Sequence, residues 1–458
     1  MEIKLEHKNT LRTEPIGGLL RKFAIPSIIA MLVGALYNIV DQIFIGHKIG
    51  ELGNAATNVT FPIITACIAL ALLVGIGGAA SFNLSLGEGK KELASSYIGN
   101  SLVLLFIFGL SLLVISQIFL TPLLKAFGSP DSVLGYAKTY LRITSLGFPF
   151  LIMTSGGGHL IRADGSPKYA MFSNLLGAII NTILDPLLIF GLNMDMAGAA
   201  WATVIGQAFS FLSIIIYFIY YKRVKLAKEN FLLKGIYLKK ITSLGTTPAF
   251  NQISMMVVQI IMNNSLVYYG RQSIYGEDVP LAAAGIISKV AMIFFAIIIG
   301  ISQGMQPIAS YNYGAKQYKR VKRVYQLAIT SSAIFALGAF LIFQLIPKTI
   351  LSLFGNGTEE YFKFAIAYFR IYMFFTFINF LQPVSSNLFT SIGKPKKGIF
   401  LSLTRQILFL IPLIIILPLI FGIDGIIYAG PIADLMAALV SVIMITREFS
   451  KMKEINSN

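Results

Sequence analysis

The sequence predicts an all-α membrane protein, in which twelve transmembrane helices form two six-helix lobes related by a parallel internal repeat. Three observations lead to this prediction. Hydrophobic residues make up 56% of the 458 residues, and charged residues only 12%. Lysine and arginine gather in alternate connections between the apolar segments, and the two halves of the chain echo each other. This composition excludes a soluble enzyme, a disordered chain and a coiled coil.

Transmembrane helices are expected wherever about 20 mostly apolar residues can cross roughly 30 Å of hydrocarbon. The single cysteine, Cys67, lies in the second such segment, so the sequence offers no internal disulfide. The twelve expected spans are residues 23–46, 55–84, 97–120, 137–160, 168–190, 197–220, 243–268, 281–308, 324–346, 362–390, 398–420 and 425–445.

The placement of Lys and Arg predicts the orientation in the membrane. The two tails and the connections on their side carry 27 of the 37 basic residues, whereas the opposite connections carry four, namely Lys48, Lys125, Arg271 and Lys348. Cytoplasmic loops hold the basic excess, so both termini are predicted to be cytoplasmic in a multi-pass protein of the inner (plasma) membrane. The net charge of +17 then indicates contact with anionic lipid, and no nucleic-acid partner is expected.

The repeat relates each half of the chain to the other at a nearly constant offset. Tyr140-Leu141-Arg142-Ile143 recurs as Tyr368-Phe369-Arg370-Ile371, and Gly165-Ser166-Pro167-Lys168 recurs as Gly393-Lys394-Pro395-Lys396. We therefore expect an N-terminal lobe over residues 1–220, a basic cytoplasmic linker over 221–242 and a C-terminal lobe over 243–458. Six spans in each half give both repeats the same direction, which suits alternating access by rocking of the lobes. The protein is expected to be a monomer.

Three prolines inside the predicted spans are candidate hinges, because proline removes a backbone hydrogen bond from a helix. Pro26 and Pro248 lie near the cytoplasmic ends of the first and seventh spans, and Pro383 lies within the tenth. The alternative is that these positions have no special role, since proline is common in membrane helices.

Two acidic residues lie deep inside predicted spans. Asp41 is in the first span and Asp185 in the fifth, and the helical rise of about 1.5 Å per residue places both about 8 Å inside the outer boundary. Thr203, on the sixth span, lies at a similar level. Tyr37 and Asn181 each precede an Asp by four residues, so each pair shares one helix face. Three helices of one lobe thus present oxygen-bearing side chains in one layer.

Such a layer could bind a proton or a metal cation. Two carboxylates in a low-dielectric pocket cannot both stay charged cheaply, so a proton or a small hard cation such as Na⁺ should neutralise them. The alternative is that each Asp only caps a broken helix or bonds a neighbouring hydroxyl. The second half has Asn263-Asn264 and Ile411-Pro412 at the matching places, which confines the acidic site to the first lobe.

The remaining polar groups lead to weaker expectations. Pairing or snorkelling within the second lobe is expected for four charged residues whose roles stay open, namely Lys289, Arg370, Arg405 and Asp434. Three His and one Cys cannot build a zinc cluster, and no nucleophile motif occurs, so neither an enzyme nor a cofactor is expected. An adaptable substrate cavity is predicted around Asn38, Asn174, Met256 and Met292.

Four segments carry a resemblance to the multidrug and toxic compound extrusion (MATE) family. They are Tyr37-Asn38-Ile39-Val40-Asp41-Gln42, Arg162-Ala163-Asp164-Gly165-Ser166-Pro167, Asn181-x-x-x-Asp185-Pro186 and Gln306-Pro307-Ile308-Ala309-Ser310-Tyr311-Asn312-Tyr313-Gly314-Ala315. The resemblance covers the whole chain. It implies a twelve-helix exporter that exchanges external Na⁺ or H⁺ for amphipathic, often cationic, compounds. It also implies that Asp41 is the coupling carboxylate, with Asn181, Asp185 and Thr203 as cation ligands and Tyr37 beside them.

The predicted function is therefore secondary active multidrug efflux by cation antiport, a class of transport associated with antibiotic resistance. Two alternatives stay open at this point. A lipid or lipid-linked oligosaccharide flippase of the same fold would need several cationic residues in the cleft to bind phosphate. A membrane-embedded aspartyl protease could use two Asp residues at similar depth, although its characteristic surroundings are missing. One cluster of oxygen ligands would serve Na⁺ and H⁺ equally, so the sequence leaves the coupling ion open.

Overall fold

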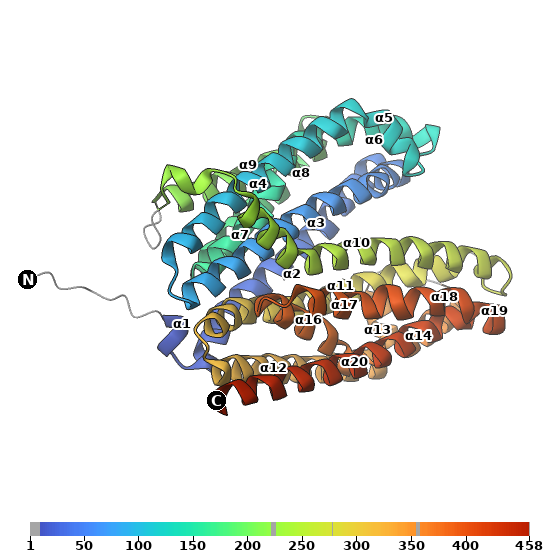
Figure 1. The fold of residues 1–458 in the computed structure, drawn as a ribbon. Helices are drawn as coiled ribbons and strands as arrows, with labels where there is room; N and C mark the ends of the chain where they lie inside the picture. The colour runs from blue at the N-terminus through green and yellow to red at the C-terminus, as the bar shows by residue number, and fades with distance from the viewer. Residues whose placement is uncertain (1–9, 221–225, 277, 354–357, 458) are drawn as a thin grey trace, which may run out of the picture.

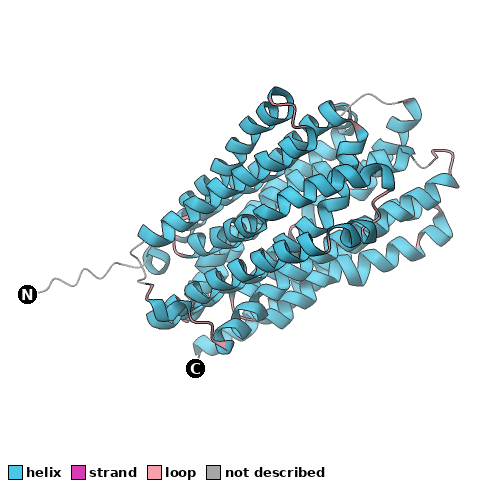
Figure 2. Cartoon of the chain, turned by 90° about the horizontal axis from the view of Figure 1, so that it is seen from above, coloured by secondary structure: helices cyan, strands magenta, loops and turns pink. Residues whose placement is uncertain are grey.

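The computed structural model describes residues 10–220, 226–276, 278–353 and 358–457 as a bundle of helices that run roughly along one axis (Figure 1; Figure 2). These residues contain no β-strand, so the predicted all-α class is confirmed. The elements are α1 (Thr10–Thr13), α2 (Ile16–Ile49), α3 (Glu51–Gly87), α4 (Lys91–Ile118), α5 (Leu120–Ala126), α6 (Asp131–Thr144), η1 (Ser145–Gly147), α7 (Phe148–Ala163), α8 (Pro167–Pro186), η2 (Leu187–Gly191), α9 (Asp195–Tyr220), η3 (Lys228–Phe231), α10 (Gly235–Arg271), α11 (Asp278–Gly314), α12 (Tyr318–Leu345), α13 (Pro347–Ser352), α14 (Glu359–Tyr372), α15 (Thr376–Asn379), α16 (Leu381–Ser391), α17 (Pro395–Leu403), η4 (Thr404–Leu410), α18 (Ile411–Ile416), α19 (Pro418–Phe421) and α20 (Ile423–Ser457).

Ten helical segments of the described chain are long and apolar enough to cross a membrane. The expected spans 137–160 and 243–268 are not among them. The first is divided by the 3-10 turn η1 into α6 and α7, of 14 and 16 residues. The second lies within α10, a helix of 37 residues whose apolar character is lowered by polar side chains such as Asn251, Gln259 and Asn263. The structure thus describes a multi-pass helical protein, and the count of twelve spans stays a prediction.

The repeated Gly-x-Pro sequence forms the same turn twice. Gly165 (φ +97°) follows α7 and Gly393 (φ +74°) follows α16, both in the left-handed region that glycine adopts without strain. Two residues later, Pro167 and Pro395 each open the next helix, where the missing N–H of proline is no loss. The equivalent motifs of the two halves therefore have the same local structure.

The two halves also interrupt their helices at matching positions. Helix α6 ends at Thr144 and α14 ends at Tyr372, and the same offset relates these two residues as relates Tyr140 to Tyr368. Among the hinge candidates, Pro383 lies at the third position of α16, just beyond the short helix α15. Pro26 and Pro248 lie inside the continuous helices α2 and α10. A hinge role stays a prediction for all three.

The buried apolar side chains form two large cores. One joins α3, α4, α6 and α7 and includes Ile45 from the end of α2. The other joins the later helices and includes Leu19 and Phe23 from the start of α2. Helix α10 also contributes to both cores, but in the reverse order: Ile241 near its start belongs to the first core, and Leu266 near its end belongs to the second. The first helix of each half therefore begins in the core of the other half. The predicted lobes, 1–220 and 243–458, did not include this exchange of helix ends.

Glycines let the two halves approach closely where α3 packs against α10. A Cβ atom on Gly77 of α3 would lie 1.9 Å from the carbonyl oxygen of Ile241. A Cβ atom on Gly245 of α10 would lie 1.6 Å from the carbonyl oxygen of Leu73. Real Cβ atoms do not approach so closely, so side chains at these positions would force α3 and α10 apart.

Candidate ion-binding site in the first half

The predicted site residues come from three packed helices. Helix α2 carries Tyr37 and Asp41, one turn apart, and α8 carries Asn181 and Asp185 with the same spacing. Helix α9 carries Thr203 and packs against α8. The exposed fractions are 0% for Asp185, 2% for Asn181, 6% for Thr203 and 7% for Asp41. These last four residues thus lie in the protein interior, away from lipid.

Asn181 connects the two neighbouring helices. Its Nδ2 atom lies 3.4 Å from Asp185 Oδ1 and 3.4 Å from Thr203 Oγ1. With the amide turned to suit both neighbours, Nδ2 donates to Asp185 Oδ2 at 3.1 Å, and Oδ1 accepts from the backbone N–H of Thr203 at 3.1 Å. The Thr203 hydroxyl donates to the carbonyl oxygen of Ala199 at 3.0 Å, which leaves its lone pairs for a cation or a further donor.

A close helix contact makes this arrangement possible. Gly177 of α8 faces Gly206 of α9, and a Cβ atom on Gly206 would lie 2.6 Å from the Gly177 carbonyl oxygen. The same Cβ atom would lie 3.1 Å from the Cβ atom of Asn181. Side chains at the two glycines would therefore separate α8 from α9 and draw Asn181 away from Thr203.

The carboxyl groups of Asp41 and Asp185 lie close enough to interact with each other. Two carboxyl groups at this range need either a shared proton or a cation between them. The Asp41 Oδ1 atom is buried and finds no amide or hydroxyl donor in the part of the chain that the structure describes. Its free lone pairs, with the oxygens of Asp185, Asn181 and Thr203, form the type of donor set that suits a small hard cation.

Metals that prefer nitrogen or sulfur ligands have no matching site in the described residues. Nowhere among them do three His, Cys, Asp or Glu side chains gather around one point. The site has two carboxyl groups and otherwise neutral oxygens, which are the type of ligand that a proton or a small hard cation takes.

Two tyrosines complete the site, and the sequence analysis identified only one of them. The hydroxyl groups of Tyr37 and Tyr140 both lie near the Thr203 side chain and near the carboxyl groups of Asp41 and Asp185. Tyr140 lies on α6 and is 5% exposed. It belongs to the repeated segment Tyr140-Leu141-Arg142-Ile143, which marked the repeat but was not connected with the acidic layer. A buried tyrosine hydroxyl requires a polar partner, and this was the signal that could have identified Tyr140.

The four residues predicted to line a substrate cavity lie apart from this cluster. Asn38 is exposed and donates to the Gly34 carbonyl, while the half-buried Asn174 donates to the Ala170 carbonyl. Met256 is half-buried on α10, and Met292 is exposed on α11. Two cavities, of about 490 and 750 Å³, are lined by other residues, among them Lys22 and Tyr169 in the first and Glu88 and Lys316 in the second. Their part in binding substrate stays a prediction.

The charged residues of the second half have different environments. Arg405 of η4 pairs with Asp434 of α20, whereas Arg370 donates to the Gln344 carbonyl at 3.2 Å. Lys289 is exposed on α11. The predicted pairing inside the second half therefore holds for Arg405 and Asp434.

Comparisons with known proteins identify the family of the chain. The model of the family described as MatE matches residues 26–187 and 249–416. The multidrug export protein MepA of Staphylococcus haemolyticus is 27% identical over 430 residues, which cover 92% of each chain. The FAD transporter of Shewanella oneidensis is 24% identical over 448 residues, which cover 95% of each chain.

Solved structures share the fold at low sequence identity. One, described as the outward-facing conformation of a multidrug resistance MATE family transporter of the MOP superfamily, has a TM-score of 0.90 at 23% identity. The match covers 97% of this chain and 98% of that one. A crystal structure of MATE in complex with MaL6 also has a TM-score of 0.90, at 22% identity, over 97% of this chain and 99% of the other. At this level of identity, the similarity establishes the fold.

Proposed function

The chain belongs to the MatE family of multi-pass membrane transporters, and from this premise we propose that it exports amphipathic or cationic compounds by antiport against Na⁺ or H⁺. The observation that carries the proposal is the contact between the buried side chains of Asp41 and Asp185. A transporter family is not a family of enzymes, so the aspartyl protease alternative is excluded. The two Asp residues instead exchange a cation.

The proposed architecture is two six-helix lobes, residues 1–220 and 243–458, joined by a basic linker over 221–242, of which residues 221–225 lie outside the described chain. The paired helix ends at Thr144 and Tyr372, and the match of one family model to two segments, support this repeat. We place both termini in the cytoplasm and the protein in the plasma membrane, because the basic residues gather on the side of the termini.

The proposed cycle exchanges the coupling cation for a drug molecule. A cation that enters from outside binds between Asp41 and Asp185, removes their negative charge and shifts α2. Bound drug is then disfavoured, because binding of drug and of cation must weaken each other reciprocally. The two halves next rock apart at the end of the bundle where Gly77 and Gly245 hold them together, and the cation leaves to the cytoplasm.

The proposed substrates follow from the names of relatives and from the composition. MepA of Staphylococcus haemolyticus is described as a multidrug export protein, which supports a broad apolar specificity. A flippase for lipid-linked phosphates would need free cationic side chains in its cleft. Arg405 is already neutralised by Asp434, and Arg370 donates to a backbone carbonyl, so these residues do not favour that function.

Purified protein in vesicles should extrude a fluorescent organic cation when a sodium or proton gradient is imposed, and stop when that gradient collapses. Sodium and pH gradients applied one at a time identify the coupling ion. The expected result is uphill flux with one of the two gradients and none without a gradient. Flux that persists unchanged with neither gradient would contradict antiport.

Replacing Tyr140 with Phe should weaken binding of the coupling ion by about 5- to 10-fold, because it removes a buried hydroxyl group beside Thr203 and the two Asp residues, and one polar interaction of this kind contributes about 1 to 1.5 kcal/mol. The concentration of the coupling ion that gives half-maximal efflux measures this effect. Tyr136→Phe, on an exposed tyrosine of the same helix, is the matched control. An unchanged half-maximal concentration in Tyr140→Phe would remove this tyrosine from the site.

A further inference from the structure

A cavity between the two halves has no part in the proposed transport cycle. Its volume of about 750 Å³ is in the range of small-molecule binding sites. Its lining comes from the turn between α3 and α4, the start of α10, the turn between α11 and α12, and the turn before α17. These connections belong to the basic side of the protein, which we place in the cytoplasm. The cavity therefore depends on both halves and lies on the cytoplasmic side.

Three lysines line this cavity, together with one glutamate. Lys90 pairs with Glu88 at 2.8 Å, so the carboxylate is already compensated. Lys240 and Lys316 form no ion pair within the part of the chain that the structure describes. Lys240 Nζ lies 5.3 Å from the centre of the Tyr97 ring, which holds the ammonium group without neutralising it. Three lysines against one glutamate leave the lining with a net charge of +2.

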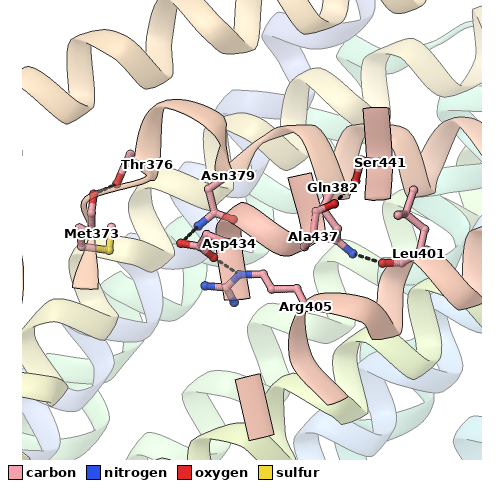
Figure 3. A network of polar contacts seen from close by, with 9 residues as sticks. All are labelled: Met373, Thr376, Asn379, Gln382, Leu401, Arg405, Asp434, Ala437 and Ser441. Carbon is pink, nitrogen blue, oxygen red and sulfur yellow. Dashed lines mark hydrogen bonds and ion pairs between the residues drawn. The ribbon is translucent and has the colours of Figure 1, made fainter. Parts of the chain in front are cut away.

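The buried charges of the second half are different, because they compensate one another. Arg405 Nε donates to Asp434 Oδ1, and Asn379 donates to Asp434 Oδ2 at 3.1 Å (Figure 3). This ion pair needs no ligand. The uncompensated charge of the cavity lining, in contrast, is available to an anion.

The two halves meet in the same way on either side of the cavity. A Cβ atom on Gly87 of α3 would lie 2.1 Å from the carbonyl oxygen of Tyr311. A Cβ atom on Gly314 of α11 would lie 2.2 Å from the carbonyl oxygen of Leu84. The residue numbers of the two glycines differ by as much as those of the two carbonyl residues, so each contact is the counterpart of the other. The cavity thus lies where α3 and α11 pack against each other about the axis that relates the halves.

The turns that follow these two glycines have the same backbone but differ in one side chain. The N–H of Gly89 donates to the Leu86 carbonyl, and the N–H of Lys316 donates to the Tyr313 carbonyl, both at 3.0 Å. Gly89 has φ +81° and Lys316 has φ +57°, so both lie in the left-handed region. Glycine adopts this conformation freely, whereas lysine does so at a cost in stability. The second half therefore has a strained lysine at the cavity where the first half has an unstrained glycine, which indicates a function for its charge.

The rest of the lining also suits a phosphate group. Lysine ammonium groups bind phosphate as point charges. Helices α4 and α12 begin directly after the two turns, so the partial positive charge of their N-termini adds to that of the lysines. The rings of Tyr313 and Tyr318, which line the cavity, form an edge-to-face pair with 5.4 Å between their centres. These rings give an organic phosphate an apolar surface beside the charges.

We propose that this cavity binds a phosphate-bearing anion, which contacts lysines of both halves and favours the state in which their cytoplasmic ends are in contact. Such an anion can reach Lys90 and Lys316 together only while α3 packs against α11, so binding and packing stabilise each other. The anion is either a soluble organic phosphate or the head group of an anionic lipid, which share the same chemistry. The inference goes beyond the proposed antiport and does not depend on it.

The test measures binding by the full-length chain in a non-ionic detergent, at neutral pH and constant ionic strength, without a cation gradient. The probes are pyrophosphate for the soluble source and dioctanoyl phosphatidylglycerol for the lipid source. Dioctanoyl phosphatidylcholine, whose head group has no net charge, is the control. The rise of the thermal unfolding midpoint with probe concentration gives the dissociation constant. The expected result is saturable binding of one or both anionic probes, which identifies the source, and no binding of phosphatidylcholine.

Lys316→Gly separates loss of the site from loss of folding. It should weaken binding of the anionic probe by about 10-fold, because one charge-assisted contact is removed. The unfolding midpoint without ligand should not fall, because glycine is the residue that the first half has at this turn. Lys316→Arg keeps the charge and should bind the probe as the unmodified protein does.

Variants of the first half test whether the anion bridges the two halves. Lys90→Gln should weaken binding about as much as Lys316→Gly does. Glu88→Gln should strengthen binding by about 5-fold, because it removes the negative charge of the lining and releases Lys90. Lys228→Gln, which changes an exposed lysine of η3 outside the cavity, is the matched control and should leave binding unchanged.

The proposal is overturned if neither anionic probe binds, or if phosphatidylcholine binds equally well. It is also overturned if Lys228→Gln weakens binding as much as Lys316→Gly, since net charge alone would then explain the affinity. Weaker binding in only one of Lys90→Gln and Lys316→Gly would place the anion on one half and contradict the bridge. All of these outcomes concern binding alone, so they are distinct from a failure of cation-driven efflux.

Discussion

Asp41→Asn should abolish uphill efflux while leaving the protein folded in the membrane. The asparagine has nearly the same shape but cannot take up a proton or balance a cation, so occupancy of the site no longer depends on the gradient. Loss of a typical coupling free energy of about 1 to 3 kcal/mol lowers gradient-driven accumulation by about 5- to 150-fold. Flux of a fluorescent cation in vesicles, with the sodium and pH gradients imposed separately, measures the loss.

The control for this experiment is Asp424→Asn, which changes an exposed acid at the start of α20 in the same way. Its efflux should equal that of the unmodified protein. Binding measurements add a second readout: the affinity of Asp41→Asn for drug should no longer change with the coupling ion, as linkage requires. If Asp41→Asn retains full efflux, Asp41 has no coupling role.

Gly245→Val should open the contact between α3 and α10 and stop the transport cycle. The valine Cβ would start 1.6 Å from the Leu73 carbonyl oxygen, a backbone atom that no side-chain movement can relieve. Overpacking of this kind costs about 1 to 3 kcal/mol, which shifts a two-state equilibrium by about 5- to 150-fold away from the closed contact. Efflux should fall accordingly, because the cycle needs both states.

The conformational change can be measured with spin labels on two exposed residues, one from each half, that line one cavity: Glu88 at the end of α3 and Lys316 after α11, with Cys67 replaced by alanine. The distance between the labels should increase in Gly245→Val. Gly338→Val is the matched control, because a Cβ atom on Gly338 meets nothing within 4 Å. An unchanged distance together with normal efflux in Gly245→Val would show that this contact does not control access.

The local sequence predicted the helices better than their interruptions. Apolar length specified the spans, and the Gly-x-Pro motif specified the turns at Gly165 and Gly393, because both depend on neighbouring residues only. The breaks after Thr144 and Tyr372 were not predicted. Gly147 and Pro149 follow the first break and disfavour a continuous helix there, whereas Met373 after the second break has no strong tendency to break a helix, so tertiary packing decides where α14 stops.

The candidate site was predicted in part. Helix geometry placed Asp41, Asp185 and Thr203 at one depth, and the structure brings them into one cluster with Asn181 and a tyrosine pair. Depth along a helix follows from residue number, since each residue adds about 1.5 Å. Which helix faces which does not follow from it. Tyr140 was missed for this reason, because α6 lies far in the sequence from α9, which carries Thr203, and meets α9 only through packing.

The sequence by itself determined that this chain is a bundle of membrane helices with Asp41 and Asp185 at a similar depth in the first half, because hydropathy, charge placement and the position of a carboxylate along a helix are local properties. Only the tertiary structure decided that Asp41 meets Asp185, that Asp434 is neutralised by Arg405, and that α2 and α10 each begin in the core of the opposite half. Those features depend on the rotation and crossing of helices, which contacts between glycines such as Gly177 and Gly206 set by admitting one pair of backbones and excluding others.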